Sequence, residues 1–374
     1  MTMSELKSGD GSAQRAIKRP MSTVLQGPAP LTAPSSQPSG GQSPGGESSG
    51  GASDGKPSGG IGLVAGFAAV GPKARTVILP LVGIVVFILL WALTAPMVKT
   101  SLGALPGPVA VATQGVSLVE EWQAGQAEKS AFYDAQSARN AALEAAGRGA
   151  EAQDFRYSGS PNFIDQIFTS LFTVAFGFGL ASLVAVPLGL VCGLSKGFNA
   201  AFNPLVQIFK PISPLAWLPI VTMVVSATMT DPDPTLPKSF VISAVVVMLC
   251  SLWPTLINTA VGAASIDKDL LNVGRVLRLS PFARLRRLIL PSALPYIFTG
   301  MRLSLGVGWM VLIAAEMLAQ NPGLGKFVWD EFQNGSEQSL ARIMFAVIII
   351  GVIGFLLDRL MMALQSLASR NHET

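Results

Sequence analysis

The chain has 374 residues, of which 50% are hydrophobic and only 13% are charged. A soluble domain usually carries about 25% charged residues, so this deficit and a mean hydropathy of +0.49 exclude an ordinary soluble protein and indicate that lipid is the main solvent. The formal net charge of +4 is small, so the positions of the basic residues matter more than their number.

Residues suited to metal or covalent chemistry are scarce. Cys192 and Cys250 lie inside apolar runs, so we interpret both as small core residues and not as a disulfide or metal pair. The only histidine, His372, is expected to be a solvated residue of a polar C-terminal tail. A histidine-based metal site and a Ser/His/Asp triad are therefore nearly excluded, and we predict no catalytic residue, metal ion or cofactor in this chain.

Residues 1–72 are expected to form a disordered tail. Gly, Ser and Pro dominate this segment, as in Gln37-Pro38-Ser39-Gly40-Gly41-Gln42-Ser43-Pro44-Gly45-Gly46, and almost none of its residues could form a core. The start of the chain is polar and no apolar segment follows within the usual window, so no signal peptide is expected.

Six apolar stretches follow, each long enough to cross a bilayer as a helix, which takes about 20 residues. The first is assigned to residues 73–98, and the other five lie within a core at 162–367. Those five stretches are bounded by residues 165–196, 211–230, 239–266, 291–319 and 339–363. The sequence therefore predicts an all-α integral membrane fold with six transmembrane helices.

The distribution of charge predicts the orientation of these spans. Basic residues gather before the first span and in the loop 267–291, whereas the 231–238 loop and residues 326–337 carry an acidic excess. The basic groups are Lys7, Arg15, Lys18, Arg19, Lys56, Lys73 and Arg75, and then Lys268, Arg275, Arg278, Arg284, Arg286 and Arg287. By the positive-inside rule, both termini, including a short tail at 368–374, are expected in the cytoplasm.

The segment 99–161 is then expected outside the cell membrane. Residues 117–147 are rich in Ala, Glu and Gln and are predicted to form an external helix. Two interpretations of this helix stay open. It is either a solvated spacer or a docking surface for an external partner.

The loop 267–291 is predicted to form two short helices at the inner face of the membrane. Apolar or small residues recur at helical spacing in the first helix, and Asp267 could cap its start. These residues are Leu270, Leu271, Gly274 and Leu277. Ser280 and Pro281 have the pattern of an N-cap followed by proline at the first helical position. Spacing alone leaves open whether the first helix docks on another protein or rests on anionic lipid.

The same loop resembles the coupling loop of ABC-importer permeases. That pattern reads Glu-Ala-Ala, three residues, Gly, nine residues and then Ile-x-Leu-Pro, and Leu288-Ile289-Leu290-Pro291 matches its end. The sequence departs from the pattern at Asn272-Val273-Gly274, where Glu-Ala-Ala is expected, and at Arg278, where the glycine is expected.

The similarity extends over roughly 160–367 and is strongest to the nitrate/sulfonate/bicarbonate permease family. The stretches that resemble this family are 214–220, 256–262, 295–302, 314–318 and 327–330. Residues 296–302 and 327–330 are most similar to its nitrate and bicarbonate members. The resemblance implies a type I ABC importer permease fold with a cytoplasmic coupling helix, and a role in importing a small inorganic anion. Nitrate or nitrite is the first expectation, and bicarbonate, cyanate and sulfonates such as taurine are the alternatives.

The resemblance also implies partners. No Gly-x-x-x-x-Gly-Lys-Ser/Thr loop is present, and Gly323-Leu324-Gly325-Lys326 lacks its spacing. ATP and magnesium are therefore expected on separate cytoplasmic ATPase subunits, so the chain is not expected to be an enzyme. A second permease copy, forming a homodimer, a periplasmic solute-binding protein and the lipid bilayer complete the expected partners, with no nucleic acid. A secondary transporter is the alternative class, but it would predict an internal repeat of spans, which the sequence does not show.

Two groups of site residues follow from this resemblance. The residues expected to couple to the ATPase are Asp269, Leu270, Leu271, Asn272, Gly274, Leu277, Arg278, Pro281 and Arg284. The residues expected along the substrate pathway are Trp217, Gly300, Arg302, Ser304, Gly308, Trp309 and Glu316. For Gly300, Ser304 and Gly308, whose four-residue spacing lets helices approach closely, simple packing is the alternative. Trp217 lies beside the helix-breaking prolines Pro211, Pro214 and Pro219. For Trp217 the alternative to a place on the substrate pathway is a role as an interfacial anchor.

Arg302 and Glu316 are charges inside the fifth span, where a charge costs roughly 3 kcal/mol or more. They lie too far apart on one helix to pair with each other, so each needs another partner or water. Structural pairing with neighbouring helices is one interpretation. The other gives Arg302 a role in attracting an anion and Glu316 a role in gating, and it predicts that Arg302→Ala lowers transport without lowering assembly.

Overall fold

The computed structural model describes residues 72–100, 103–231 and 235–370. The expected disordered tail at 1–72, apart from Pro72, lies outside the described residues, and so do His372 and the end of the expected tail at 368–374.

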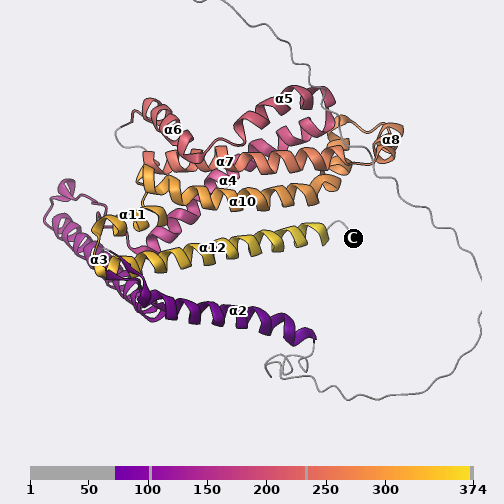
Figure 1. Cartoon of the computed structure of the whole chain (residues 1–374). Helices are drawn as coiled ribbons and strands as arrows, with labels where there is room; N and C mark the ends of the chain where they lie inside the picture. Colours follow the sequence, from indigo (N-terminus) through magenta and orange to yellow (C-terminus); the bar gives the residue numbers. More distant parts are fainter. Residues whose placement is uncertain (1–71, 101–102, 232–234, 371–374) are drawn as a thin grey trace, which may run out of the picture. The chain divides into compact units, whose positions relative to one another are not determined.

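The described residues are mostly helical (Figure 1). The helices are α2 Pro72–Thr94, α3 Pro108–Ala145, α4 Phe163–Leu194, α5 Lys196–Phe209, α6 Pro214–Thr228, α7 Lys238–Ala264, α8 Lys268–Val276, α9 Pro281–Arg284, α10 Leu290–Ala319, α11 Leu324–Asn334 and α12 Glu337–Arg370. Short turns lie at η1 Ala95–Met97, η2 Gly149–Glu151 and the π-helical turn η3 Leu285–Ile289. The two-residue strands β1 Lys99–Thr100 and β2 Gly103–Ala104 pair antiparallel, with Lys99 opposite Ala104.

Among the described residues, five segments are long and apolar enough to cross a membrane, and the count is six if the bent pair α5–α6 forms one span. The third predicted stretch, 211–230, contains α6, and the break expected from its prolines lies at the start of that helix. α6 has 15 residues, and α5, which the sequence reading missed, precedes it at a bend of 100°. The break falls at Pro211 and at Pro214, the first residue of α6, because proline lacks the amide hydrogen that a continuing helix requires.

The core of the bundle is a layer of three helices, with α7 packed between α4 and α10, and with α12 along the far side of α10 (Figure 1). Glycines permit the close approach of the backbones. A Cβ atom on Gly177 of α4 would lie 2.6 Å from the carbonyl oxygen of Ala244 on α7, and one on Gly300 of α10 would lie 2.8 Å from Cβ of Asn258. Leucine, valine and tryptophan side chains fill the remaining space between these helices.

Two further elements differ from the sequence prediction. The external helix predicted at 117–147 begins nine residues earlier, at Pro108, because Gly107 takes the extended N-cap conformation and proline suits the first turn. The stretch after α10 forms the helix α11, which was not predicted. At the other end of the bundle, α8 lies near the C-terminal end of α12 (Figure 1).

Candidate functional site

The α8–α9 corner is built by two capped helix starts. The Asp267 carboxylate accepts a hydrogen bond from the Asp269 amide at 2.9 Å, and the Ser280 hydroxyl accepts one from the Ala283 amide at 3.2 Å. Both caps were predicted. The second helix is not separate, however, because it continues through the π-helical turn into α10.

One side of α8 is fixed against the start of α10. Gly274 is buried, and a Cβ atom there would lie 2.7 Å from Cδ1 of Leu288. Leu270 packs against the cluster that contains Ile289 and Ala293. Arg284 lies beside Gly274 and is half-buried. Of the predicted apolar stripe, Leu270 and Gly274 therefore pack against the segment that leads into α10.

The corner also exposes large apolar side chains. Their exposed fractions are 82% for Val276, 71% for Phe282, 64% for Leu277 and 50% for Val273. Leu277 belongs to the predicted apolar stripe, but it follows the last residue of α8 and lies on the exposed part of the corner. We call Val273, Val276, Leu277 and Phe282 the apolar corner.

The other predicted coupling residues surround the apolar corner. Asp269, Asn272 and Pro281 are exposed, and Asn272 accepts a hydrogen bond from the Arg275 guanidinium at 3.1 Å. The side chain of Leu271 is outside the described part of the chain. The contact of these residues with an ATPase stays a prediction.

Arg278 terminates α8 in the left-handed conformation, with φ of 49°. The Leu279 amide donates to the Gly274 carbonyl at 3.1 Å, and the Arg278 amide donates to the Arg275 carbonyl at 2.9 Å. These two bonds form the Schellman motif, in which glycine is the usual residue at the left-handed position. The structure thus gives a physical reason for the glycine of the coupling-loop pattern, at the position that Arg278 occupies here.

Gly300, Ser304 and Gly308 face α7 and are buried. The Ser304 hydroxyl accepts from the Thr255 amide at 3.0 Å and from the Thr255 hydroxyl at 2.7 Å, and it donates to the Ser251 carbonyl. Within one chain these three residues therefore pack α10 on α7. Their place along a substrate pathway stays a prediction.

Arg302 pairs with Asp358 of α12. Its Nε lies 2.5 Å from Oδ1 and its Nη2 lies 2.9 Å from Oδ2, which is a bidentate ion pair. Both side chains are about two-fifths exposed, at 41% and 38%. Trp309 is buried on the same side of α10 and donates to the Ile350 carbonyl at 3.0 Å. A partner of Arg302 was expected from the sequence. That this partner is Asp358, a carboxylate inside the sixth apolar stretch, was not predicted.

Glu316 is fully buried at the other end of α10. Its carboxylate accepts from the Ser170 hydroxyl at 2.8 and 2.9 Å and from the Gly325 amide at 3.0 Å. The Leu324 amide donates to the Ser170 oxygen at 2.8 Å. Glu316 and Ser170 thus satisfy the first amides of α11, where a negative charge is favoured. Its role in gating stays a prediction.

Trp217 braces the bent pair α5–α6. Its ring stacks on Phe209 of α5 at 5.9 Å between centroids, and Phe209 stacks on Trp253 of α7 at 6.2 Å. Trp217 is half-buried in this stack. Neither of its two predicted roles, interfacial anchor or pathway constriction, is decided by this contact.

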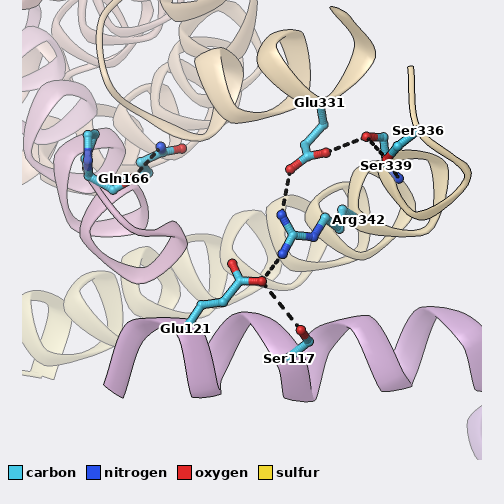
Figure 2. A network of polar contacts seen from close by, with 8 residues as sticks. Ser117, Glu121, Gln166, Glu331, Ser336, Ser339 and Arg342 are labelled. Carbon is cyan, nitrogen blue, oxygen red and sulfur yellow. Dashed lines mark hydrogen bonds and ion pairs between the residues drawn. The ribbon is translucent and has the colours of Figure 1, made fainter. Parts of the chain in front are cut away.

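A polar network joins α3, α11 and α12 at the end of the bundle opposite α8 (Figures 1 and 2). The Arg342 guanidinium of α12 pairs with Glu121 of α3 and, at 3.0 Å, with Glu331 of α11. The Ser339 hydroxyl donates to Glu331 at 2.7 Å, and Ser117 lies beside Glu121. We call Glu121, Arg342 and Glu331 the clamp. From the sequence, Glu331 was noted only as part of the acidic excess at 326–337, and its pairing with Arg342 was not predicted.

Comparisons with known proteins agree with this architecture. Residues 185–370 match a family model described as a binding-protein-dependent transport system inner membrane component. The nitrate import permease protein NrtB of Synechocystis sp. is 39% identical over 202 residues, which cover 54% of this chain and 68% of that protein. The bicarbonate transport system permease protein CmpB of Synechococcus elongatus is 33% identical over 304 residues, covering 80% and 92%. A chain of the inward-facing MetNI methionine ABC transporter is similar at a TM-score of 0.47 and 13% identity, covering 55% of this chain and 95% of that one.

Proposed function

Because this chain belongs to the nitrate and bicarbonate branch of the ABC-importer permeases, we propose that it forms the membrane-spanning part of an ATP-driven importer of nitrate or nitrite. The protein is a transport permease with the helices to cross a membrane. We propose its energy source, partners and substrate from the observations that follow.

The apolar corner is the observation that supports a docked ATPase subunit as the energy source. Large apolar side chains at a charged end of the molecule mark an interaction site when they lie together. Val276 and Phe282 are 82% and 71% exposed on a short segment that is capped at both helix starts and fixed to α10. The corner is therefore suited to docking on a cytoplasmic ATPase subunit, which would bind ATP and magnesium, and to transmitting its movement to α10.

The corner also supports an orientation. Arginines surround it, and basic loops stay on the cytoplasmic side of a membrane. We place the α8 end and both termini in the cytoplasm, and the end that carries α3 and α11 outside. A second copy of the permease would complete the pathway, and a solute-binding protein would deliver the anion from outside.

Two observations bear on the anion. Identity to the nitrate permease is 39%, against 33% and 38% to two bicarbonate permeases, whereas the similarity to one bicarbonate permease covers more of both chains. Bicarbonate is therefore the second candidate. Cyanate and sulfonates remain alternatives within the same class, whereas the family membership argues against the secondary transporter that the sequence left as the alternative class.

The docking role is tested by a matched pair of variants. Val276→Asp places a charge on the corner, and Val109→Asp places one at the opposite end on a valine that is equally exposed, at 81% against 82%. We expect Val276→Asp to reduce co-purification of the importer's ATPase and ATP-driven uptake at least tenfold, and Val109→Asp to leave both unchanged. Equal effects of the two changes would contradict the docking role.

The substrate is tested by uptake into proteoliposomes that hold the permease, its ATPase and its binding protein. Isotope-labelled nitrate and bicarbonate are compared with and without ATP. The proposal expects ATP-dependent accumulation of nitrate. Accumulation of bicarbonate alone would select the second candidate, and accumulation without ATP would overturn the ABC assignment.

A further inference from the structure

The helix α3 has two halves with different environments. In the first half Val111, Gly115 and Leu118 are buried, and Gly115 lies against the ring of Phe345 on α12. In residues 123–145, the outer half, no residue is buried. The helix is therefore docked on the bundle at its start and projects from it afterwards.

The outer half is nevertheless a built structure. The segment 152–161 returns along it, and Gln136 accepts from the Phe155 amide at 2.9 Å. The Tyr133 hydroxyl accepts from the Tyr157 amide at 3.3 Å. Gln136 and Asn140 both donate to the carboxylate of Asp154, at 3.2 and 3.1 Å. A helix that only separated two spans would not need this bracing.

Aromatic side chains gather on this braced part. The ring of Phe132 makes edge contacts with Tyr133 at 5.4 Å and with Tyr157 at 5.6 Å between centroids. Tyr133 is 39% exposed and Phe155 is 50% exposed. Two of the three tyrosines in the chain lie here. We call Phe132, Tyr133, Phe155 and Tyr157 the aromatic platform.

Such a platform suits a protein partner better than a lipid surface. Exposed aromatic residues on a rigid support are the usual anchors of protein interfaces. A helix that lies in a membrane surface instead needs one apolar face and a basic polar face. The outer half lacks this division, because charged residues surround it at roughly 100° per residue. They are Glu128, Lys129, Asp134, Arg139 and Glu144.

The clamp connects the first half of α3 to the core helices. Arg342 holds Glu121 of α3 and Glu331 of α11 together (Figure 2). The other end of α11 is bonded to Glu316 of α10 through the Gly325 amide. Force on α3 therefore reaches α10 through three successive polar contacts, two of Arg342 and one of Glu316.

We propose that the aromatic platform is the docking surface for the importer's extracytoplasmic binding protein, and that the clamp transmits docking to the core helices. The proposal rests on the proposed function, and in particular on the outward orientation of α3. The partner is a protein that the family description itself requires, since that description names transport as binding-protein-dependent.

The test uses the complete importer in lipid nanodiscs and measures ATP hydrolysis against the concentration of its purified, nitrate-loaded binding protein. We expect Tyr133→Ala with Phe155→Ala to raise the half-maximal concentration roughly tenfold or more, since truncated aromatic anchors cost about that much or more in affinity. Hydrolysis without binding protein should not change. The matched control is Arg139→Ala, which is exposed on the same helix about 120° around its axis from Tyr133.

A second variant separates docking from bracing. Tyr133→Phe removes the hydroxyl that accepts from Tyr157 but keeps the ring, and it should keep the half-maximal concentration of the unmodified importer. If the double alanine variant behaves as Arg139→Ala does, the docking surface is wrong. The same conclusion follows if a fluorophore at Phe155→Cys is quenched by lipids carrying headgroup nitroxides. If the binding protein does not stimulate ATP hydrolysis by the unmodified importer at all, the proposed function itself is wrong.

Discussion

Arg278 shows what one residue contributes to the α8–α9 corner. Its backbone has φ of 49°, a conformation that costs a side-chain-bearing residue roughly 1 kcal/mol relative to glycine. The Schellman bonds that end α8 require this conformation. The arginine therefore stores a small strain in the loop that we propose to contact the ATPase.

We predict that Arg278→Gly stabilises the purified protein by roughly 0.5–1 kcal/mol. Arg275→Gly, three residues earlier and still within helical backbone, should destabilise it by about 1 kcal/mol. Hydrogen exchange of the α8 amides measures both changes. Slower exchange for Arg278→Gly and faster exchange for Arg275→Gly are expected, and a change of the same sign in both variants would contradict the account.

Arg302 is a charged residue inside a span, and two roles have been predicted for it. Its bidentate pair with Asp358 supports a structural role, and the second predicted role of the same guanidinium is to attract an anion. Removing Arg302 alone leaves the carboxylate of Asp358 without this partner in an apolar region, which is costly. A single substitution therefore changes assembly and transport together.

The double variant Arg302→Ala/Asp358→Ala separates the two roles. If the pair is structural, we expect the double variant to recover most of the assembled complex that Arg302→Ala loses, and to recover transport with it. If Arg302 attracts the anion, assembly should recover while ATP-driven uptake stays at least tenfold low. Detergent-resistant complex yield and uptake per complex are the two measurements.

At the scale of elements, the clamp joins three helices that are far apart in the sequence. Glu331 has a side chain that is only 9% exposed, whereas Glu121 is 48% exposed. Arg342 therefore neutralises a buried carboxylate and holds α3 with its other nitrogen. The two functions can be separated, because loss of Glu121 leaves the buried pair intact.

We predict that Glu121→Gln loosens α3 without unfolding the bundle. Its cost should be about 1 kcal/mol or less, since the pair is largely exposed on the Glu121 side. A spin-label distance between Ser137→Cys and α12 should broaden, and maximal stimulation by the binding protein should fall. Glu120→Gln, the neighbouring exposed carboxylate, should change neither quantity, and a similar effect of both variants would argue against the clamp.

At the scale of the whole molecule, the proposed orientation places the apolar corner and the aromatic platform on opposite sides of the membrane. α2 supports this arrangement as a separate span. It has 6% of its apolar window buried within the chain, against 56% for α7. Lipid or another protein chain must therefore cover most of its surface.

A membrane-impermeant maleimide tests the orientation. Val276→Cys should react only in inside-out vesicles, and Ser137→Cys should react only in intact cells whose outer membrane has been permeabilised. The native Cys192 is buried and Cys250 is partly buried, so background labelling should be low. Reaction of both variants from the same side would refute the six-span topology.

The sequence by itself determined which stretches span the membrane and where the short helices begin. Span length and charge placed α4, α7, α10 and α12 to within a few residues, because apolar composition along one segment is sufficient for that inference. The caps at Asp267 and Ser280 were predicted for the same reason, since a helix start depends on neighbouring residues. Resemblance over the core then gave the family.

Tertiary structure decided the partners of the charged residues. Helical periodicity could say that Arg302 and Glu316 needed partners, but not that these were Asp358, 56 residues away, and Ser170, 146 residues away. The clamp was equally hidden, whereas the prolines predicted the break before α6 but not the helix α5 or its bend of 100°. These features depend on which helices pack side by side, and that choice comes from the summed burial of many residues, so no single spacing in the chain records it.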